Sequence, residues 1–293
     1  MIGWLIYSKE DATKNEAYIG FYMEEGKNKG IEIRLIYRED IRFGVFEGKH
    51  DLKYQGKMIP LPDFVICRTI YPLLSRQLEL FNIPVFNNAT VAEICNDKAK
   101  TYQYVAQTEI PMISTSFVKN YELKEYLMNI QEPSVIKAVD GHGGSQVMLL
   151  DQADLSEVDV MEDIIYRMKG SDVVIQPLTG KKCMDLRVYV IGTNVIAAIL
   201  RKAKTGFRSN YSLGGHVEVY KLSENELEIV NRVIGLFDFG LVGIDFLIGD
   251  EGELIFNEIE DVVGARMLYS CCDINLVDLY LEYIINRIRK KRK

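Results

Sequence analysis

The chain has 293 residues, of which 48% are hydrophobic and 26% charged, and its formal net charge is −7 at pH 7. This length predicts two domains, or three small ones, and the negative charge makes nucleic acid an unlikely partner. No stretch approaches the roughly 18 apolar residues of a membrane span, so we expect no membrane partner.

The cysteines and the first residues predict a cytoplasmic location. The five cysteines are an odd number without metal-type spacing, so we expect reduced thiols rather than a disulfide framework. The apolar run from Ile2 to Tyr7 lacks the basic segment and the long apolar segment of a signal peptide.

Residues 1–90 alternate between strand and helix patterns, which predicts a small domain with a parallel sheet. No Gly-x-Gly-x-x-Gly follows the first strand, so a dinucleotide site is not expected there. The expected strands are Ile2–Tyr7, Ile31–Tyr37, Phe64–Cys67 and Pro84–Phe86, and the expected helices are Asn15–Lys29 and Pro72–Phe81.

Residues 91–178 form the second expected domain. Capping signals at Thr90 with Glu93, and at Asp97, predict two helices, the second running from Lys98 to Gln107. The strands expected after them are Met112–Val118, Ser134–Val139, Gln146–Leu150 and Asp172–Gln176, and the helices lie near Leu123–Met128 and Met161–Lys169.

The remaining residues are expected to form paired strands followed by helices. A capping box at Ser223 and Glu226 predicts the helix Glu224–Phe237. The expected strands before it are Asp185–Ile191, Val195–Arg201 and His216–Lys221, and a hairpin and a helix from near Asn275 follow it.

Three carboxylates mark that hairpin, whose strands are joined by the turn Gly249–Gly252. Glu258 and Glu260 lie two residues apart on one strand and should project to the same side. If Asp245 on the other strand faces them, three carboxylates converge. Such a cluster is costly without a cation, and its oxygens suit Mg²⁺, with Mn²⁺ as an alternative. The simpler alternative is a polar hairpin face with solvated acids.

Two earlier segments carry residue types that bind phosphate. Gly141, Gly143 and Gly144 lie in a turn between strands, where backbone N–H groups could close over phosphate oxygens, or where they simply make the turn. Lys137 ends the preceding apolar strand, either as an edge lysine or as a phosphate ligand.

A strand and a loop add cationic residues. Arg187 alternates with apolar residues, so it either points into a cleft or makes a cross-strand ion pair. The polar loop from Lys202 to Gly215 contains Arg208 and Asn210, and its mixture of cations, an amide and glycines suits an anionic ligand.

These segments, in this order, resemble the ATP-grasp ligase superfamily, in particular its RimK-like branch. The likeness covers roughly residues 90–270. It rests on Val-Ile-Lys137, Gly141-His-Gly143-Gly144-Ser, Gln176-Pro-Leu, Asp185-Leu-Arg187-Val, Phe-Arg208-Ser-Asn210 with Gly214-Gly215, Val-Gly-Ile-Asp245, and Asn257-Glu258-Ile.

The resemblance implies an α/β chain, α+β overall. Residues 1–90 would be a pre-ATP-grasp domain with a parallel sheet. The two α+β subdomains of an ATP-grasp fold would follow, a central one with a glycine-rich flap (residues 91–178) and a C-terminal one with the metal site (residues 179–293).

The resemblance also implies roles for the matching residues. ATP would be bound by Lys98, Lys137, the flap residues Gly141, His142, Gly143, Gly144 and Ser145, and the adenine-contacting Gln176, Pro177 and Leu178. Catalysis would involve Arg187, Arg208 and Asn210, Mg²⁺ would bind to Asp245, Glu258 and Glu260, and substrate would meet Arg208 and Arg266.

One departure from the family pattern is the second metal strand. The family usually has Glu-x-Asn there, and the chain then continues as Asn-x-Pro-Gly. This chain instead has Glu258-Ile-Glu260 and then Asp261-Val-Val-Gly264. A third carboxylate keeps an oxygen ligand but adds negative charge.

The implied activity is that of an ATP-dependent carboxylate–amine ligase, which forms an amide through an acyl phosphate and releases ADP and phosphate. Its partners would be a small-molecule or peptide carboxylate and an amine acceptor, and a homo-oligomer is an open possibility. Two alternatives are a regulatory ATP-binding protein of the same fold that has lost catalysis, and a kinase-like enzyme that stops at a phosphorylated product.

Overall fold

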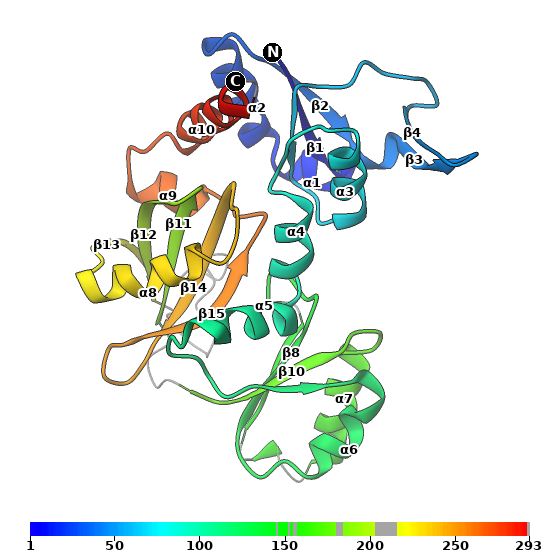
Figure 1. Ribbon diagram of the computed structural model, residues 1–293. Helices are drawn as coiled ribbons and strands as arrows, with labels where there is room; N and C mark the ends of the chain where they lie inside the picture. Colours follow the sequence, from blue (N-terminus) through cyan, green and yellow to red (C-terminus); the bar gives the residue numbers. More distant parts are fainter. Residues whose placement is uncertain (145, 152, 155–156, 180–183, 203–215, 292–293) are drawn as a thin grey trace.

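The computed structural model describes residues 1–144, 146–151, 153–154, 157–179, 184–202 and 216–291. In this part of the chain a parallel sheet is followed by two antiparallel sheets, each with helices packed against it (Figure 1). The expected mixed α/β fold, with a parallel sheet at the N-terminus, is confirmed. None of the helices described is long and apolar enough to cross a membrane.

The parallel sheet has the strand order β2-β1-β5-β6. The four strands expected from the sequence are all present, since each is an apolar run bounded by turn residues. The elements of this domain are β1 Ile2–Tyr7, α1 Lys9–Lys14, α2 Glu16–Asn28, β2 Glu32–Tyr37, the 3₁₀ helix η1 Arg38–Asp40, β5 Phe64–Cys67, α3 Pro72–Leu80 and β6 Val85–Phe86.

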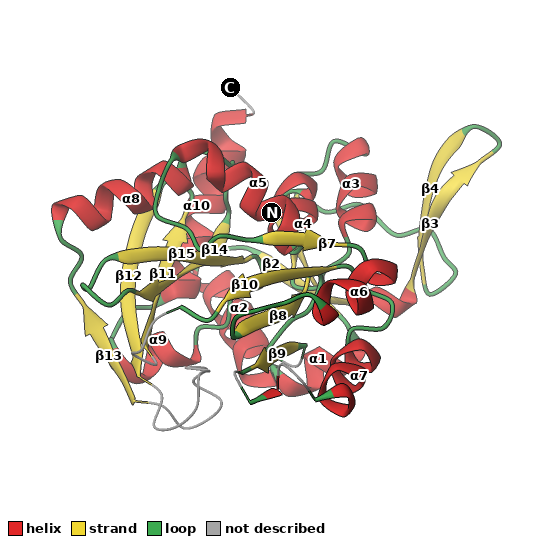
Figure 2. Cartoon of the chain, turned by 90° about the horizontal axis from the view of Figure 1, so that it is seen from below, coloured by secondary structure: helices red, strands yellow, loops and turns green. Residues whose placement is uncertain are grey.

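Two features of this domain are not predicted from the sequence. Helix α1, capped by Ser8, precedes α2 as a separate helix. The hairpin of β3 (Ile41–Phe46) and β4 (Lys49–Tyr54) projects from the domain (Figure 2). Only its base is buried, through Ile41 and Leu52. Apolar residues toward its tip, such as Val45 and Phe46, are exposed, so the alternation by which strands are recognised is short.

The central sheet is antiparallel, with the order β7-β10-β8-β9. Asp97 caps α5 as expected, whereas the capping box expected at Thr90 is wrong, because Asn88 caps α4 and Thr90 lies inside the helix. The elements are α4 Ala89–Cys95, α5 Lys98–Val105, η2 Ala106–Thr108, β7 Ser116–Val118, η3 Asn120–Glu122, α6 Leu123–Met128, β8 Ser134–Ala138, β9 Val147–Leu150, α7 Val158–Arg167 and β10 Val173–Pro177.

The C-terminal sheet is antiparallel, with the order β13-β12-β11-β14-β15. Its elements are β11 Met184–Ile191, β12 Asn194–Lys202, β13 His216–Tyr220, α8 Glu224–Ile234, β14 Leu241–Ile248, β15 Leu254–Glu260, α9 Arg266–Cys271 and α10 Leu276–Lys291. The capping box at Ser223 and Glu226 is confirmed at the start of α8. Helix α9 is not predicted from the sequence.

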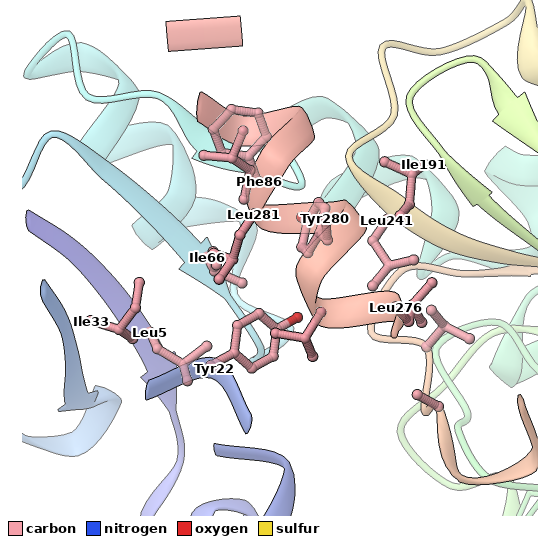
Figure 3. Close-up of a cluster of buried hydrophobic side chains, with 14 of the residues drawn as sticks. Leu5, Tyr22, Ile33, Ile66, Phe86, Ile191, Leu241, Leu276, Tyr280 and Leu281 are labelled. Carbon is pink, nitrogen blue, oxygen red and sulfur yellow. The ribbon is translucent and has the colours of Figure 1, made fainter. Parts of the chain in front are cut away.

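The two faces of this sheet pack into different cores. One face is covered by α8. The other contributes Tyr189 and Leu241 to a core shared with α10 and the N-terminal sheet. Figure 3 shows Leu5 and Ile66 of that sheet, α10 with Leu281, and Ile191 around this core. The last helix of the chain thus joins the first domain to the third, and the expected boundaries at residues 90 and 178 stay a prediction.

Candidate active site

The candidate site lies on the face of the C-terminal sheet that α8 does not cover. Apolar residues alternate along β11 and pack under α8, so Asp185, Arg187 and Tyr189 lie on the opposite face. Arg187 faces Asp245 of β14, and its Nε and Nη2 donate to the two carboxylate oxygens over 2.8 and 2.7 Å. The cross-strand ion pair considered for Arg187 is therefore present. Asp245 is only 1% exposed, so it is not a solvated acid.

A second arginine, Arg201 of β12, extends this pair into a buried network. Arg201 faces Asp185 in the strand register and donates to it from Nε over 2.6 Å, with a further ion pair through Nη2. The same Nη2 donates to Asp245 over 2.7 Å. Neither Asp185 nor Arg201 is among the site residues predicted from the sequence. The signal available in the sequence is an acid at the start of one expected strand and an arginine at the end of the next, which lie opposite each other when the two strands pair as a hairpin.

The network keeps Asp245 ionised. Burial alone would raise the pKa of this carboxyl group, but Arg187 and Arg201 outweigh it and lower the pKa of Asp245 to about 2. Burial raises the pKa of Asp185 to about 6, against the opposing effect of Arg201. Removing one partner of such a buried network typically costs about 3–5 kcal/mol, because the remaining charge is left without compensation.

A β-bulge in β15 brings two neighbouring side chains to the site. The register between β14 and β15 shifts after the pair Asp245 and Glu258, so that Asn257 is the extra residue. Bulges redirect side chains. Here Asn257 Oδ1 accepts a hydrogen bond from Lys137, and Glu258 Oε2 lies 3.8 Å from Lys98 Nζ. Asn257 thus joins the site, although regular alternation would place it on the opposite face from Glu258.

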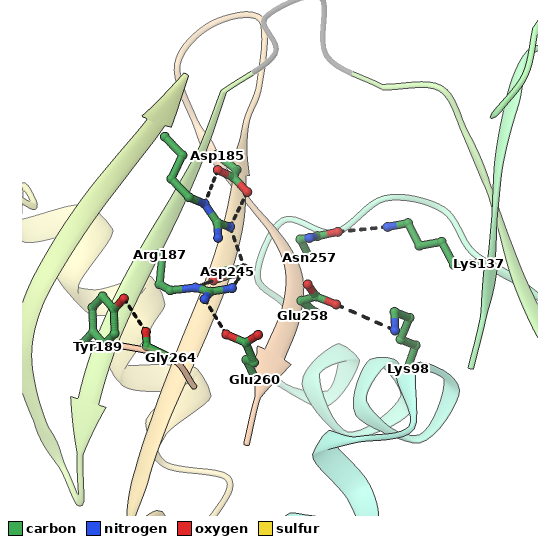
Figure 4. Close-up of polar contacts among 11 residues, drawn as sticks. Lys98, Lys137, Asp185, Arg187, Tyr189, Asp245, Asn257, Glu258, Glu260 and Gly264 are labelled. Atoms are coloured by element: carbon green, nitrogen blue, oxygen red, sulfur yellow. Dashed lines mark hydrogen bonds and ion pairs between the residues drawn. The ribbon is translucent and has the colours of Figure 1, made fainter. Parts of the chain in front are cut away.

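Lys98 and Lys137 reach this point from the central subdomain (Figure 4). Lys98 is the first residue of α5, and its Nζ donates to the carbonyl of Gly141 over 2.5 Å. Lys137 lies on β8 between two neighbouring strands, so the edge-lysine alternative is wrong. Its Nζ donates to Asn257 over 3.0 Å. Burial lowers the pKa of Lys137 to about 8, with Glu258 opposing and Lys98 adding to the shift.

The glycine turn beside Lys98 joins β8 and β9 as a hairpin, as expected. Gly143 and Gly144 have φ angles of +63° and +74°, in the left-handed region that favours glycine. Burial lowers the pKa of His142, and the neighbouring Lys98 adds to this shift. Ser145 lies outside the described residues.

The remaining predicted residues are placed as follows. The side chain of Gln176 is buried and donates to Thr115 over 2.9 Å, at the end of β10, whose last residue is Pro177. The backbone N–H of Leu178 donates to the carbonyl of Pro133 over 2.8 Å. Arg266 is exposed at the start of α9. Arg208 and Asn210 lie outside the described residues, and the roles of this set stay predictions.

The expected convergence of three carboxylates is not found. Among the described residues, no group of three or more His, Cys, Asp or Glu side chains could hold a metal ion. The reason is Arg187, which pairs with Asp245 and, through Nη1, with Glu260 (Figure 4). The metal role of Asp245, Glu258 and Glu260 stays a prediction.

The donors present nevertheless fit a divalent cation. Glu260 Oε2 is buried and forms an ion pair with Arg187 Nη1 rather than a regular hydrogen bond. Burial raises the pKa of Glu260, and repulsion by Asp245 and Glu258 adds to the shift while Arg187 opposes it. The side chain of Glu258 is 38% exposed. A cation at this edge would relieve the repulsion, and carboxylate oxygens are the ligands that Mg²⁺ prefers.

Among the residues that the structure describes at this site, the formal charges balance. The four acids Asp185, Asp245, Glu258 and Glu260 meet the four bases Lys98, Lys137, Arg187 and Arg201. A polyphosphate would bring several further negative charges, so a divalent cation accompanying it would restore the balance.

Comparison with known proteins identifies the family of this fold. A family model for the RimK-like ATP-grasp domain matches residues 95–284. Among curated relatives, a "Probable alpha-L-glutamate ligase" of Legionella pneumophila (strain Corby) is 29% identical over 273 residues, covering 89% of this chain and 88% of that protein. An uncharacterised protein, MG011, of Mycoplasma genitalium is 25% identical over 289 residues, covering 97% and 92%.

Solved structures share the fold over nearly the whole chain. The ATP-grasp ligase PsnB, complexed with a minimal precursor, has a TM-score of 0.69 at 17% identity and covers 97% of this chain and 98% of its own. The same ligase has been solved with Mg and ADP, with a TM-score of 0.67 at 17% identity and 98% of each chain covered. D-alanyl-alanine synthetase A from Vibrio cholerae has a TM-score of 0.72 at 16% identity and covers 98% of each chain.

Proposed function

Because the chain belongs to the RimK-like ATP-grasp family, we propose that it is an ATP-dependent carboxylate–amine ligase. The γ-phosphoryl group of ATP passes to a substrate carboxylate, which forms an acyl phosphate and releases ADP. An amine then attacks the carbonyl carbon, loses a proton and expels inorganic phosphate, leaving an amide.

The observation that carries this proposal is the meeting of two lysines with β15. Lys98 and Lys137 come from different elements of the central subdomain, and their Nζ atoms lie 3.8 Å from Glu258 and 3.0 Å from Asn257. A buried and a half-buried lysine held against acidic and amide groups of another sheet provide a place for a phosphate chain between the subdomains. The glycine turn contacts one of these lysines, because the carbonyl of Gly141 accepts a hydrogen bond from Lys98 Nζ.

Mg²⁺ is the metal proposed to accompany ATP. Glu258, Glu260 and Asp245 are the residues that would hold it, and when bound it would neutralise phosphate charge and polarise the transferred group. Arg187 orients Asp245 and Glu260 by pairing with both. Mn²⁺ has the same preference for oxygen ligands and is the alternative.

The protein residues need little covalent chemistry for this reaction. Lys98 and Lys137 bind phosphate oxygens and orient them, and Arg187, with Arg208 and Asn210 of the loop outside the described residues, is proposed to face the transferred phosphoryl group. Positioning and charge stabilisation of this kind supply most of the acceleration in phosphoryl transfer. The adenine is assigned to Gln176, Pro177 and Leu178, and the acceptor side to Arg266.

The first candidate for a substrate is L-glutamate. A curated relative that is 29% identical is named as a probable alpha-L-glutamate ligase, which supports glutamate as the carboxylate or the amine. The acceptor can be a free amino acid, a peptide or a protein, and PsnB, a ligase of the same fold, has been solved with a precursor peptide.

The test is ADP release from ATP and Mg²⁺ in the presence of single amino acids, pairs of amino acids and peptides, with mass spectrometry of the products. We expect ADP and phosphate only when a carboxylate and an amine are both present. The product should have the mass of the two substrates together less one water. A phosphorylated product without an amide would identify the kinase alternative. If the protein binds nucleotide but releases no ADP with any pair of carboxylate and amine, the regulatory alternative is favoured.

The matched control for this assay is Lys124→Met, which changes an exposed lysine of the same subdomain. It should turn over as the wild type does, whereas Lys137→Met should lose ADP release. Equal rates for Lys137→Met and the wild type would contradict the placement of the phosphates.

A further inference from the structure

The N-terminal sheet holds a buried arginine that the proposed reaction does not use. Arg68 directly follows β5, is 7% exposed, and pairs with none of the described acidic side chains. Its Nε donates to the hydroxyl of Tyr7 over 3.3 Å, and its Nη2 donates to the carbonyl of Val263 over 2.9 Å. A guanidinium group has five N–H donors, so these two contacts leave most of its donors available.

Arg68 lies just beyond the carboxyl end of β5, at an edge of the parallel sheet where ligands commonly bind. The strand order β2-β1-β5-β6 places the second strand on one side of β1 and the third on the other, so the chain reverses direction across the sheet between β1 and β5. Tyr7 ends β1, and Arg68 follows β5. In open parallel sheets, ligands bind outside the carboxyl ends of the strands at such a switch point.

Two tyrosine hydroxyls near Arg68 have no acceptor or donor among the described residues. Both Tyr18 Oη and Tyr22 Oη are buried and unpartnered. The guanidinium carbon of Arg68 lies 5.5 Å from the ring centroid of Tyr18, which in turn packs edge-on against Tyr22 at 5.2 Å. Figure 3 shows Tyr22 between Leu5 and α10, with its hydroxyl directed toward the helix. Unpartnered buried hydroxyls and an unpaired buried cation are both costly, which points to a missing anionic group.

A buried acid that interacts electrostatically with Arg68, Asp261, does not fill this gap. Asp261 is buried close to Arg68, but its Oδ1 accepts from Asn87 over 2.6 Å and its Oδ2 accepts from Asn96 over 2.9 Å. Its carboxylate is therefore engaged by two asparagine amides rather than by the guanidinium group.

The segment that covers Arg68 begins in the candidate active site. Glu260 pairs with Arg187, and three residues later the carbonyl of Val263 accepts from Arg68. The next carbonyl, that of Gly264, accepts from Tyr189 over 2.9 Å (Figure 4). Three residues span at most about 11 Å, so Val263 above Arg68 lies no farther than this along the chain from Glu260 in the candidate active site.

We propose that Arg68, with the hydroxyl of Tyr18 beside it, binds a substrate carboxylate that the ligation leaves intact, such as the α-carboxylate of an amino acid. A single guanidinium fork among neutral hydroxyls matches a planar monoanion, whereas the phosphates already have Lys98 and Lys137. This inference deepens the proposed function and rests on it for the identity of the reaction.

The test combines binding and kinetics in Arg68→Gln, Arg68→Lys and Tyr18→Phe, with Arg34→Gln as the control. Arg34 is an arginine of the same domain whose partner is Glu32, 2.7 Å away. Binding of L-glutamate, L-alanine and glutarate is measured by calorimetry without ATP, and the KM for the carboxylate substrate and for ATP is measured by ADP release.

We expect Arg68→Gln to weaken carboxylate binding by about 10- to 150-fold, the range of a charge-assisted hydrogen bond, with the KM for ATP unchanged. Arg68→Lys should recover part of the loss and Arg34→Gln should match the wild type. Tyr18→Phe should fold at least as stably as the wild type, because it removes an unpartnered buried hydroxyl, and should raise only the KM for the carboxylate.

Two results would overturn the inference. One is that none of the three probes binds in a way that depends on Arg68. The other, decisive if Arg68→Gln does not fold, is that Tyr18→Phe has the wild-type KM for the carboxylate. Carboxylate binding that depends on Arg68 in a protein without ADP release would uphold the site and reject the proposed reaction, so the two failures are distinguishable.

Discussion

The depressed pKa of Lys137 predicts that nucleotide binding depends on pH. Lys137 has a pKa of about 8 because it is buried. A bound phosphate favours the charged form and raises this pKa again, so binding takes up a proton wherever the free lysine is neutral. A nucleotide phosphate is itself ionised throughout this range, since the second phosphate pKa is about 6.

The magnitude follows from the fraction of Lys137 that is protonated in the free protein. That fraction falls from about nine-tenths at pH 7 to about one-tenth at pH 9 for a pKa of about 8, so affinity for a non-hydrolysable ATP analogue should fall about tenfold, or about 1.4 kcal/mol. At pH 8, binding should take up about half a proton. The sign is definite: affinity is full below pH 7 and is lost as pH rises through 8.

Calorimetry at pH 7, 8 and 9, in two buffers of different ionisation enthalpy, measures both the affinity and the proton uptake. Lys137→Met should bind more weakly and without the uptake at pH 8, and Lys124→Met should behave as the wild type. Lys137→Arg should lose the pH dependence, because a guanidinium group stays charged. The same proton uptake in Lys137→Met as in the wild type would refute the assignment of this lysine to the phosphates.

Three further outcomes are expected. Glu258→Gln should lower ADP release by at least about 100-fold, as loss of a charge-stabilising group does. Its melting temperature should stay near that of the wild type, because the side chain of Glu258 is 38% exposed. Wild-type turnover in this variant would reject the metal role of Glu258. Asp245→Asn should lower the free energy of unfolding in urea by about 3–5 kcal/mol, because Arg187 and Arg201 lose their shared carboxylate; a loss below about 1 kcal/mol, the range of an exposed pair, would contradict this. Glu260→Asn should keep most of the activity and alter the preference for Mg²⁺ over Mn²⁺, and a metal complex with Glu260 more than about 6 Å from the ion would contradict a ligand role.

The elements recognised from the sequence are those whose signals are local. Apolar runs bounded by turn residues predict β1 and β5, and side-chain caps predict the starts of α5 at Asp97 and α8 at Ser223. These signals depend on residues within one or two turns of each other. The β3–β4 hairpin buries only its base, at Ile41 and Leu52, and exposes its tip, so its local pattern is too short to predict two strands.

The candidate site divides in the same way. Lys98, Lys137, Arg187, Asp245 and Glu258 are identified by motifs that are short and ordered along the chain. The structure brings all five into one region from five different elements, with the glycine turn beside them. Their types and order were readable from the sequence, and their contacts were not.

Tertiary structure alone decides which charges compensate one another. Whether Asp245 meets a metal or an arginine depends on the register of β11 with β12 and β14, which places Arg187 and Arg201 beside it. The bulge that turns Asn257 toward Lys137 is a mismatch between two strands, and the burial of Arg68 under Val263 requires residues 195 positions apart to meet. Such contacts arise from register and packing between distant segments, which no local pattern encodes. The sequence by itself determined the family and the residue types of the site, while the fold decided their partners, because charge compensation depends on distances in space.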